Sequence, residues 1–153
     1  MNLRNVLIGL IFGIVIGMIA CPRAKAVEVY SVTTVRSYHT DRSAGYNENN
    51  LGVGLEVKLN STWAVVGGEY KNSFRNISHY YGLAITPFDS GHWHAGILVA
   101  TVSGYDSSDI HTFQPVIIPL VTYERNNWGI NSVIAPPLFG RSGVAGFQLK
   151  FKF

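Results

Sequence analysis

The final segment of the chain, residues 143–153, has apolar side chains at every odd position from Ala145 onward and polar ones between them from Gln148 onward. Its apolar positions are Ala145, Phe147, Leu149, Phe151 and Phe153, and between them stand Gln148, Lys150 and Lys152. A period of two is typical of a β-strand with two unlike faces. Because the sequence stops at Phe153, we expect this aromatic face to be covered from outside the chain. Lipid around a closed β-barrel meets that need, since closure also pairs both edges of the strand.

Seven earlier segments also have the composition of strands. We expect them around residues 27–38, 51–59, 63–71, 79–87, 93–99, 112–124 and 128–134. Longer polar loops (39–50, 72–78, 103–111 and 136–142) alternate with tight turns (60–62, 89–91 and 125–127). The pattern predicts an all-β fold, an eight-stranded antiparallel transmembrane β-barrel spanning residues 27–153. The alternative is a soluble β-sandwich, whose strands would not need a second apolar face.

The first 26 residues have the organisation of a cleavable signal peptide. Arg4 provides the charged start, residues 6–20 form an apolar run, and Ala24-Lys25-Ala26 fits a cleavage site. A lipoprotein processed at Cys21 is the alternative, because Met18-Ile19-Ala20 weakly resembles a lipoprotein box. We therefore expect export to the outer membrane of a Gram-negative bacterium.

Removal of the signal peptide changes the charge of the chain. Loss of Arg4, Arg23 and Lys25 takes the formal net charge from +3 to 0, which does not support nucleic-acid binding. The alternation of loops and turns places several of the remaining cations at the outer end: Arg36, Arg42, Lys71, Arg75 and Arg141. They suit an anionic glycolipid acceptor such as lipid A, although any outer-membrane barrel needs cations to sit in lipopolysaccharide.

The interior of an eight-stranded barrel holds either packed side chains or one slim ligand. Inward glycines, Gly82 among them, leave room for a narrow slot, but large side chains from opposite strands would fill it equally well. Pro115 and Pro119 cannot donate backbone hydrogen bonds, so the strand at 112–124 is expected to pair weakly with a neighbour. Such a gap would admit a lipid from the side, unless the prolines are simply tolerated beside bulges.

Several short segments resemble a known family, the PagP lipid A palmitoyltransferases. They are Tyr46-Asn47-Glu48, residues 70–74 (YKNSF), residues 115–120 (PVIIPL) and the closing segment 147–153. Their order and spacing agree with the family over most of the chain from Tyr46 onward. The resemblance implies a monomeric outer-membrane enzyme that moves an acyl chain from a phospholipid to lipid A. It also implies that the terminal Phe153 is a sorting signal for the barrel assembly machinery.

The family uses a His, an Asp and a Ser at the extracellular rim. By resemblance these positions fall on His39, Asn72 and Ser73, with His39 as base, Ser73 as hydroxyl group and Asn72 as orienting residue. Asn72 departs from the family, because an amide cannot hold a negative charge. The floor of the family's acyl slot falls on Ala84, where a glycine is usual. The added methyl predicts an acyl chain slightly shorter than palmitoyl.

Two other functions remain open from the sequence. A catalytically silent barrel would modify the cell surface by occupancy, blocking a receptor or excluding a phage, and a lipid A deacylase would use similar groups with water as acceptor. We expect no cofactor and no metal, since His92 and His94 alone make no complete metal site.

Overall fold

The computed structural model describes residues 27–105, 109–137 and 142–153. These residues form strands β1 (Glu28–His39), β2 (Asn49–Lys58), β3 (Trp63–Lys71), β4 (Ile77–Ser90), β5 (Trp93–Val102), β6 (Gln114–Arg125), β7 (Trp128–Ala135) and β8 (Val144–Lys152). None of the described residues forms a helix long and apolar enough to cross a bilayer. The expected signal peptide, Cys21 included, lies outside the described residues.

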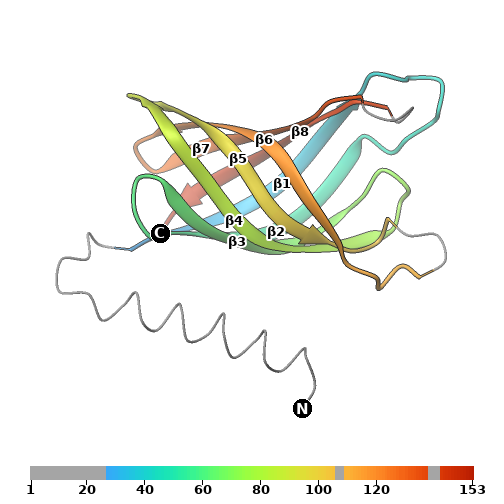
Figure 1. The fold of residues 1–153 in the computed structure, drawn as a ribbon, viewed down its shortest axis with the longest axis horizontal. Coiled ribbons are helices and arrows are strands. Elements are labelled where there is room, and N and C mark those ends of the chain that lie inside the picture. Colours follow the sequence, from blue (N-terminus) through green and yellow to red (C-terminus); the bar gives the residue numbers. More distant parts are fainter. Residues whose placement is uncertain (1–26, 106–108, 138–141) are drawn as a thin grey trace, which may run out of the picture.

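The eight strands form one antiparallel sheet that closes on itself (Figure 1). Each strand pairs with the next, and β1 pairs with β8 from Tyr30 opposite Lys152 to His39 opposite Val144. Closure gives every strand two neighbours, which removes the open edge strands that a spanning sheet cannot have in lipid. The predicted eight-stranded barrel is confirmed, and the soluble sandwich is wrong because there is one closed sheet instead of two packed ones.

The two faces of the barrel differ as the alternation predicts. Leu51, Val53 and Leu55 of β2 are exposed on the outer surface. Glu56 of the same strand is buried in the interior. Aromatic side chains gather on the outside near both ends. Around the end of the barrel with the short turns they are Trp63, Phe88, Trp93, Trp128 and Phe151. Around the end with the longer loops they are Tyr38, Phe74, Tyr81 and Phe113. Two such girdles around an apolar band are typical of barrels that span a membrane.

The two ends of the barrel are built differently. Figure 1 shows short turns at the end near the C-terminus and longer connections at the other, as expected. We call these the turn end and the loop end. The strand β4 is longer than predicted, from Ile77 to Ser90, and carries a register shift between Ile85 and Phe88.

A bulge in β1 determines which way its last residues point. Tyr30, Val32 and Thr34 face the interior, and the register then shifts between Thr34 and Arg36. Beyond this shift the buried residues are Ser37 and His39. A strand of regular alternation would turn His39 outward, because side chains two apart share a face. The bulge therefore explains the irregular sequence pattern of this strand and directs His39 inward.

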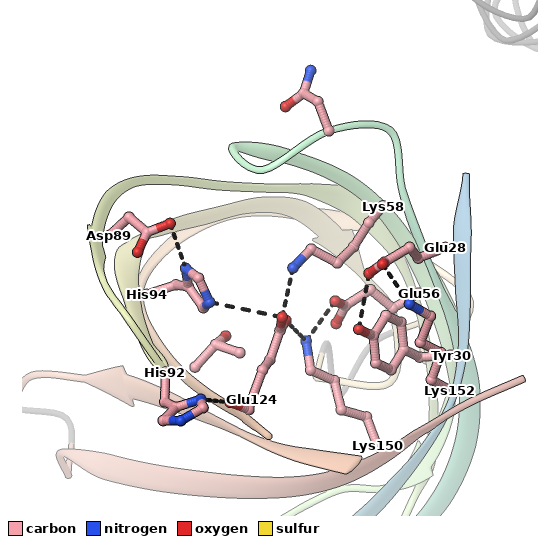
Figure 2. Close-up of polar contacts among 12 residues, drawn as sticks. Glu28, Tyr30, Glu56, Lys58, Asp89, His92, His94, Glu124, Lys150 and Lys152 are labelled. Atoms are coloured by element: carbon pink, nitrogen blue, oxygen red, sulfur yellow. Dashed lines mark hydrogen bonds and ion pairs between the residues drawn. The ribbon is translucent and has the colours of Figure 1, made fainter. Parts of the chain in front are cut away.

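Ion pairs fill the barrel at the turn end. Lys150, 1% exposed, donates to Glu56 Oε1 at 2.6 Å and to Glu124 Oε1 at 2.7 Å. Lys58 donates to the other oxygen of Glu124 at 2.6 Å, and His94 Nε2 lies 3.7 Å from that oxygen. Figure 2 shows these side chains converging on Glu124 from different strands. We call Glu56, Lys58, Glu124 and Lys150 the turn-end cluster.

Candidate functional site

His39 and Ser73 meet at the loop end of the interior. His39 is the last residue of β1 and is 8% exposed, and Ser73 is the second residue of the connection after β3. His39 Nε2 lies 2.9 Å from Ser73 Oγ, within hydrogen-bond distance. The two residues that the family resemblance singles out are therefore in contact. An imidazole in this position can accept the serine proton, which is what a hydroxyl requires to act as a nucleophile.

A carboxylate lies behind the imidazole, but it is not the one that the resemblance leads one to look for. Glu48 Oε1 accepts the backbone N–H of His39 at 3.0 Å and lies 3.7 Å from His39 Nδ1. Its other oxygen accepts from Arg42 at 3.3 Å. The N–H of His39 first, and then the charge of Arg42, hold the pKa of Glu48 below its ordinary value. His39 Nδ1 is buried without a hydrogen-bond partner among the described residues, so Glu48 is the group placed to stabilise its protonated form.

The structure corrects the expectation that Asn72 orients His39. Asn72 is fully buried, and both ends of its amide are occupied elsewhere. Nδ2 donates to Ser78 Oγ at 2.9 Å and to the Gly104 carbonyl at 2.7 Å. Oδ1 accepts from the backbone N–H groups of Phe74 at 2.9 Å and Asn76 at 3.0 Å. Asn72 thus joins the 72–76 connection to the loop after β5, and no atom is left to orient the histidine.

Aromatic rings surround the His39–Ser73 pair. Tyr46 stacks on the imidazole at a centroid distance of 4.6 Å, and Phe74 meets Tyr46 edge-on at 5.7 Å. Phe74 also packs edge-on against Tyr105 at 5.9 Å. These rings hold the imidazole in place and reduce its contact with water.

A cavity of about 160 Å³ extends from Ser73 into the barrel. Its middle is lined by apolar side chains: Val66, Leu98, Ala100, Val116, Ile118 and Val133. Glu56, Ala84 and Leu120 line both this cavity and a second one of about 10 Å³ next to the turn-end cluster. These three residues form the floor of the larger cavity. Its apolar lining suits an acyl chain with its reactive end at Ser73.

Ala84 and Gly82 differ in their relation to this cavity. Ala84 is 6% exposed and lies on the floor, where the slot was expected to end. Gly82 also faces the interior, but a Cβ there would approach the Val99 carbonyl oxygen to 2.4 Å and Ala100 Cβ to 2.5 Å. Its role is to let β4 and β5 approach each other. Gly82 does not line the cavity, and its expected part in substrate binding stays a prediction.

Strands β6 and β7 pair over only part of their length. Their ladder runs from Leu120 opposite Val133 to Arg125 opposite Trp128. The half of β6 nearer the loop end, residues 114–119, pairs with β5 but has no ladder partner in the described part of β7. Pro115 and Pro119 belong to this half. Val116 and Ile118 of β6 and Val133 of β7 line the cavity from the two sides of the gap.

The expected basic residues lie apart from one another at the loop end. Arg42 is paired with Glu48, and its guanidinium also lies 5.7 Å from the ring centre of Tyr38. Arg75 has a positive φ of 70° and donates to the Gly45 carbonyl at 3.3 Å. Lys71 is exposed at the end of β3, and Arg141 lies outside the described residues.

Metal binding has no support from the arrangement of side chains. Within residues 27–105, 109–137 and 142–153, no three His, Cys, Asp or Glu side chains are grouped to hold a metal ion. His92 binds the Glu124 carbonyl through Nδ1 at 2.8 Å, and His94 points into the barrel. The H-x-H pair is therefore divided between two environments.

Comparison with known proteins supports the fold. No protein-family model and no curated protein matches the chain. Among solved structures, a de novo designed transmembrane β-barrel has a TM-score of 0.58 and 13% sequence identity, covering 85% of this chain and 99% of the design. Likeness at this identity concerns the fold alone. Together with the closed sheet and the two aromatic girdles, it defines the class of this protein, a transmembrane-type β-barrel.

Proposed function

We propose that this protein is an outer-membrane acyltransferase that moves a fatty acyl chain from a phospholipid to lipid A. The observation that carries the proposal is the Ser73–His39 contact at the mouth of an apolar cavity. A silent barrel has no need to bury a histidine next to a serine hydroxyl at the opening of an interior slot. The resemblance to the lipid A palmitoyltransferases, carried by the residues around Ser73 and Pro115, agrees with this geometry.

The chemistry follows from the positions of the side chains. Ser73 Oγ attacks the ester carbonyl of the donor as its proton passes to His39 Nε2, and the lysolipid alkoxide leaves with that proton. A hydroxyl of lipid A then attacks the acyl-serine ester in the reverse sequence, and Ser73 regains its proton. Glu48 stabilises the imidazolium that forms in each half of the reaction.

Donor and acceptor reach the site from the loop end. The gap between β6 and β7 supports lateral entry of the donor's acyl chain. The half of β6 that does not pair with β7 has one face toward the bilayer and the other toward the cavity. The exposed cations Arg42, Lys71 and Arg75 suit the phosphates of lipid A. The proposal places the loop end at the outer leaflet, with residues 1–26 as an export signal and the barrel assembly machinery as the partner that inserts the monomer.

The test is the lipid A profile of a Gram-negative host that expresses the wild type, Ser73→Ala or His39→Ala. We expect a mass increase of one acyl group with the wild type and none with either variant, at equal levels of folded barrel in the membrane. Ser90→Ala, in the exposed turn-end part of β4, is the matched control and should retain transfer. A mass decrease would support lipid A deacylation instead, and unchanged lipid A in all strains would support the silent barrel.

A further inference from the structure

Tyr105 places a second hydroxyl beside Ser73. It stands in the loop after β5, lines the same cavity as Ser73, and its ring packs against Phe74, the residue that follows Ser73. Its hydroxyl also lies 3.0 Å from that of Tyr70, the penultimate residue of β3. Ser73 is therefore flanked by an imidazole and by a phenol, and only the imidazole has a role in the sequence of proton transfers above.

Asn72 fixes the position of this tyrosine. The Gly104 carbonyl, one residue before Tyr105, accepts from Asn72 Nδ2 at 2.7 Å and from Asn76 Nδ2 at 3.2 Å. Gly104 has a φ of +86°, and an added Cβ would come within 3.0 Å of Asn72 Nδ2. Only glycine fits both the backbone angle and the space. The Asn72–Gly104 contact thus ties the loop that carries Tyr105 to the connection that carries Ser73.

Attack on an ester creates a negative oxygen that requires a hydrogen-bond donor. His39 Nε2 is occupied by the serine proton at this stage, so it is not available to the oxyanion. A phenol that keeps its proton is a suitable donor. Burial raises the pKa of Tyr105, which keeps its hydroxyl protonated at physiological pH. The neighbouring Tyr70 hydroxyl can donate to that of Tyr105 and so strengthen the bond that Tyr105 makes.

We propose that Tyr105 is a catalytic residue that donates its hydroxyl hydrogen to the oxyanion formed at Ser73, and that Asn72 is the residue that positions it. This inference rests on the proposed acyl transfer. As the Oγ–carbon bond forms, the carbonyl π electrons move to oxygen and the serine proton moves to His39 Nε2. Tyr105 keeps its proton and donates its hydrogen bond to the new oxyanion. When the carbonyl re-forms, this hydrogen bond is released.

The first test is Tyr105→Phe, which keeps the ring against Phe74 and removes the hydroxyl. We expect kcat to fall about 10²-fold with little change in KM for the donor, as for loss of one oxyanion donor. Tyr81→Phe, on the outer surface of β4, is the matched control and should leave kcat unchanged. An alkyl fluorophosphonate should label Ser73 of the wild type, and labelling should slow in Tyr105→Phe because the phosphonyl oxygen takes the place of the oxyanion.

The outcomes separate the two proposals. A wild-type barrel that neither transfers acyl groups nor labels at Ser73 overturns both. Full transfer by the wild type with an equal kcat for Tyr105→Phe overturns the role of Tyr105 alone. A lower kcat with equal labelling rates also contradicts it, because the phosphonylation step needs the same donor.

Asn72→Asp tests the positioning role. If the family's acid acted at position 72, restoring it would raise activity. We expect the opposite, a fall in kcat of about 10-fold or more, because a carboxylate cannot donate to the Gly104 carbonyl. In a Tyr105→Phe background the same change should add little, since the two residues act through one hydroxyl. Higher kcat in Asn72→Asp, or full additivity of the two changes, would overturn the inference.

Discussion

Glu48 and Asn72 owe their roles in the site to contacts with other segments of the chain. Glu48 meets His39 because it directly precedes β2, which pairs with β1, and its backbone carbonyl accepts the N–H of Ser37 at 3.0 Å. Asn72 is held in a network of four hydrogen bonds that reaches the loop after β5. Position 72 thus holds an amide that joins two loops, and the carboxylate beside the imidazole is that of Glu48.

Glu48→Gln should slow acyl transfer about tenfold, because the variant loses the charge that stabilises the imidazolium. The amide still accepts the His39 N–H but carries no charge. We expect less than the loss seen when a hydrogen-bonded triad carboxylate is removed, because Glu48 Oε1 lies 3.7 Å from Nδ1. Initial rates of transfer measure the effect, and Glu69→Gln on the outer surface is the control.

The same carboxylate gives a pH dependence of stability. Since the folded-state pKa of Glu48 is below the ordinary 4.5, its stabilisation is complete above that pH and is lost as the pH falls through the folded-state value. The Tm of the wild type should exceed that of Glu48→Gln near neutral pH, and the two should converge in acid. A difference that persists unchanged in acid would contradict the assignment.

Ala84 lies on the cavity floor, so its size should set the length of the acyl chain. Ala84→Gly should favour a chain roughly one methylene longer, and Ala84→Met a shorter one, with about 10-fold or greater discrimination per methylene. Mass spectrometry of the modified lipid A reads the result. Identical acyl lengths from all three proteins, or a wild type that transfers only palmitoyl, would show that the chain lies elsewhere.

At the scale of strands, β6 combines a barrel wall with a gap. Its outer residues Pro115, Ile117 and Pro119 are exposed to the bilayer, and its inner residues Val116 and Ile118 line the cavity. Backbone N–H groups point to alternate edges of a strand. The backbone nitrogens of Pro115 and Pro119, four positions apart, therefore point to the same edge of β6. The ladder to β5 is complete, so the missing donors coincide with the edge next to β7.

Replacing both prolines by threonine should restore two N–H donors and allow β7 to pair further. We expect a several-fold loss of transfer with normal folding, because pairing would narrow the lateral entrance. Pro87→Thr in β4 is the control, since this proline is exposed away from the gap. Rates measured in vesicles would contradict the entry route if the double variant matched the wild type.

The strands were predictable from the sequence, and the geometry of the site only in part. The lipid outside and the packed interior place different demands on alternating residues. This alternation makes β2 and β8 easy to recognise in the sequence. His39 and Ser73 followed from family resemblance. The bulge after Thr34, the place of Glu48 and the approach of Tyr105 depend on how separate strands and loops meet in three dimensions, which no local sequence pattern records. The Tyr46-Asn47-Glu48 segment was the one available signal for Glu48.

At the scale of the whole molecule, the barrel combines an apolar slot with a charged base. Lys150 lies between two acids and 4.9 Å from the ring centre of Tyr30, almost without exposure. Buried charges of this kind are tolerated only when each is paired. The turn-end cluster therefore stabilises the barrel only as long as each of its charges keeps a partner. The cluster also separates the cavity from the turn end.

Lys150→Met should lower the free energy of unfolding by about 3–5 kcal/mol, because it leaves Glu56 and Glu124 short of a cation. Equilibrium urea unfolding in lipid vesicles measures this. The control is Lys152→Met, whose partner Glu28 is partly exposed and whose loss should cost at most about 1 kcal/mol. Equal losses in both variants would mean that burial of the cluster does not determine its contribution.

The turn-end cluster also has a consequence for the order of events at Ser73. Because this cluster closes the base of the cavity, lipids can reach Ser73 only from the loop end and the adjoining gap between β6 and β7. Under the proposed acyl transfer, the two lipids would share this end of the barrel. The lysolipid would therefore have to leave before lipid A binds, and the acyl group would stay on Ser73 in the interval.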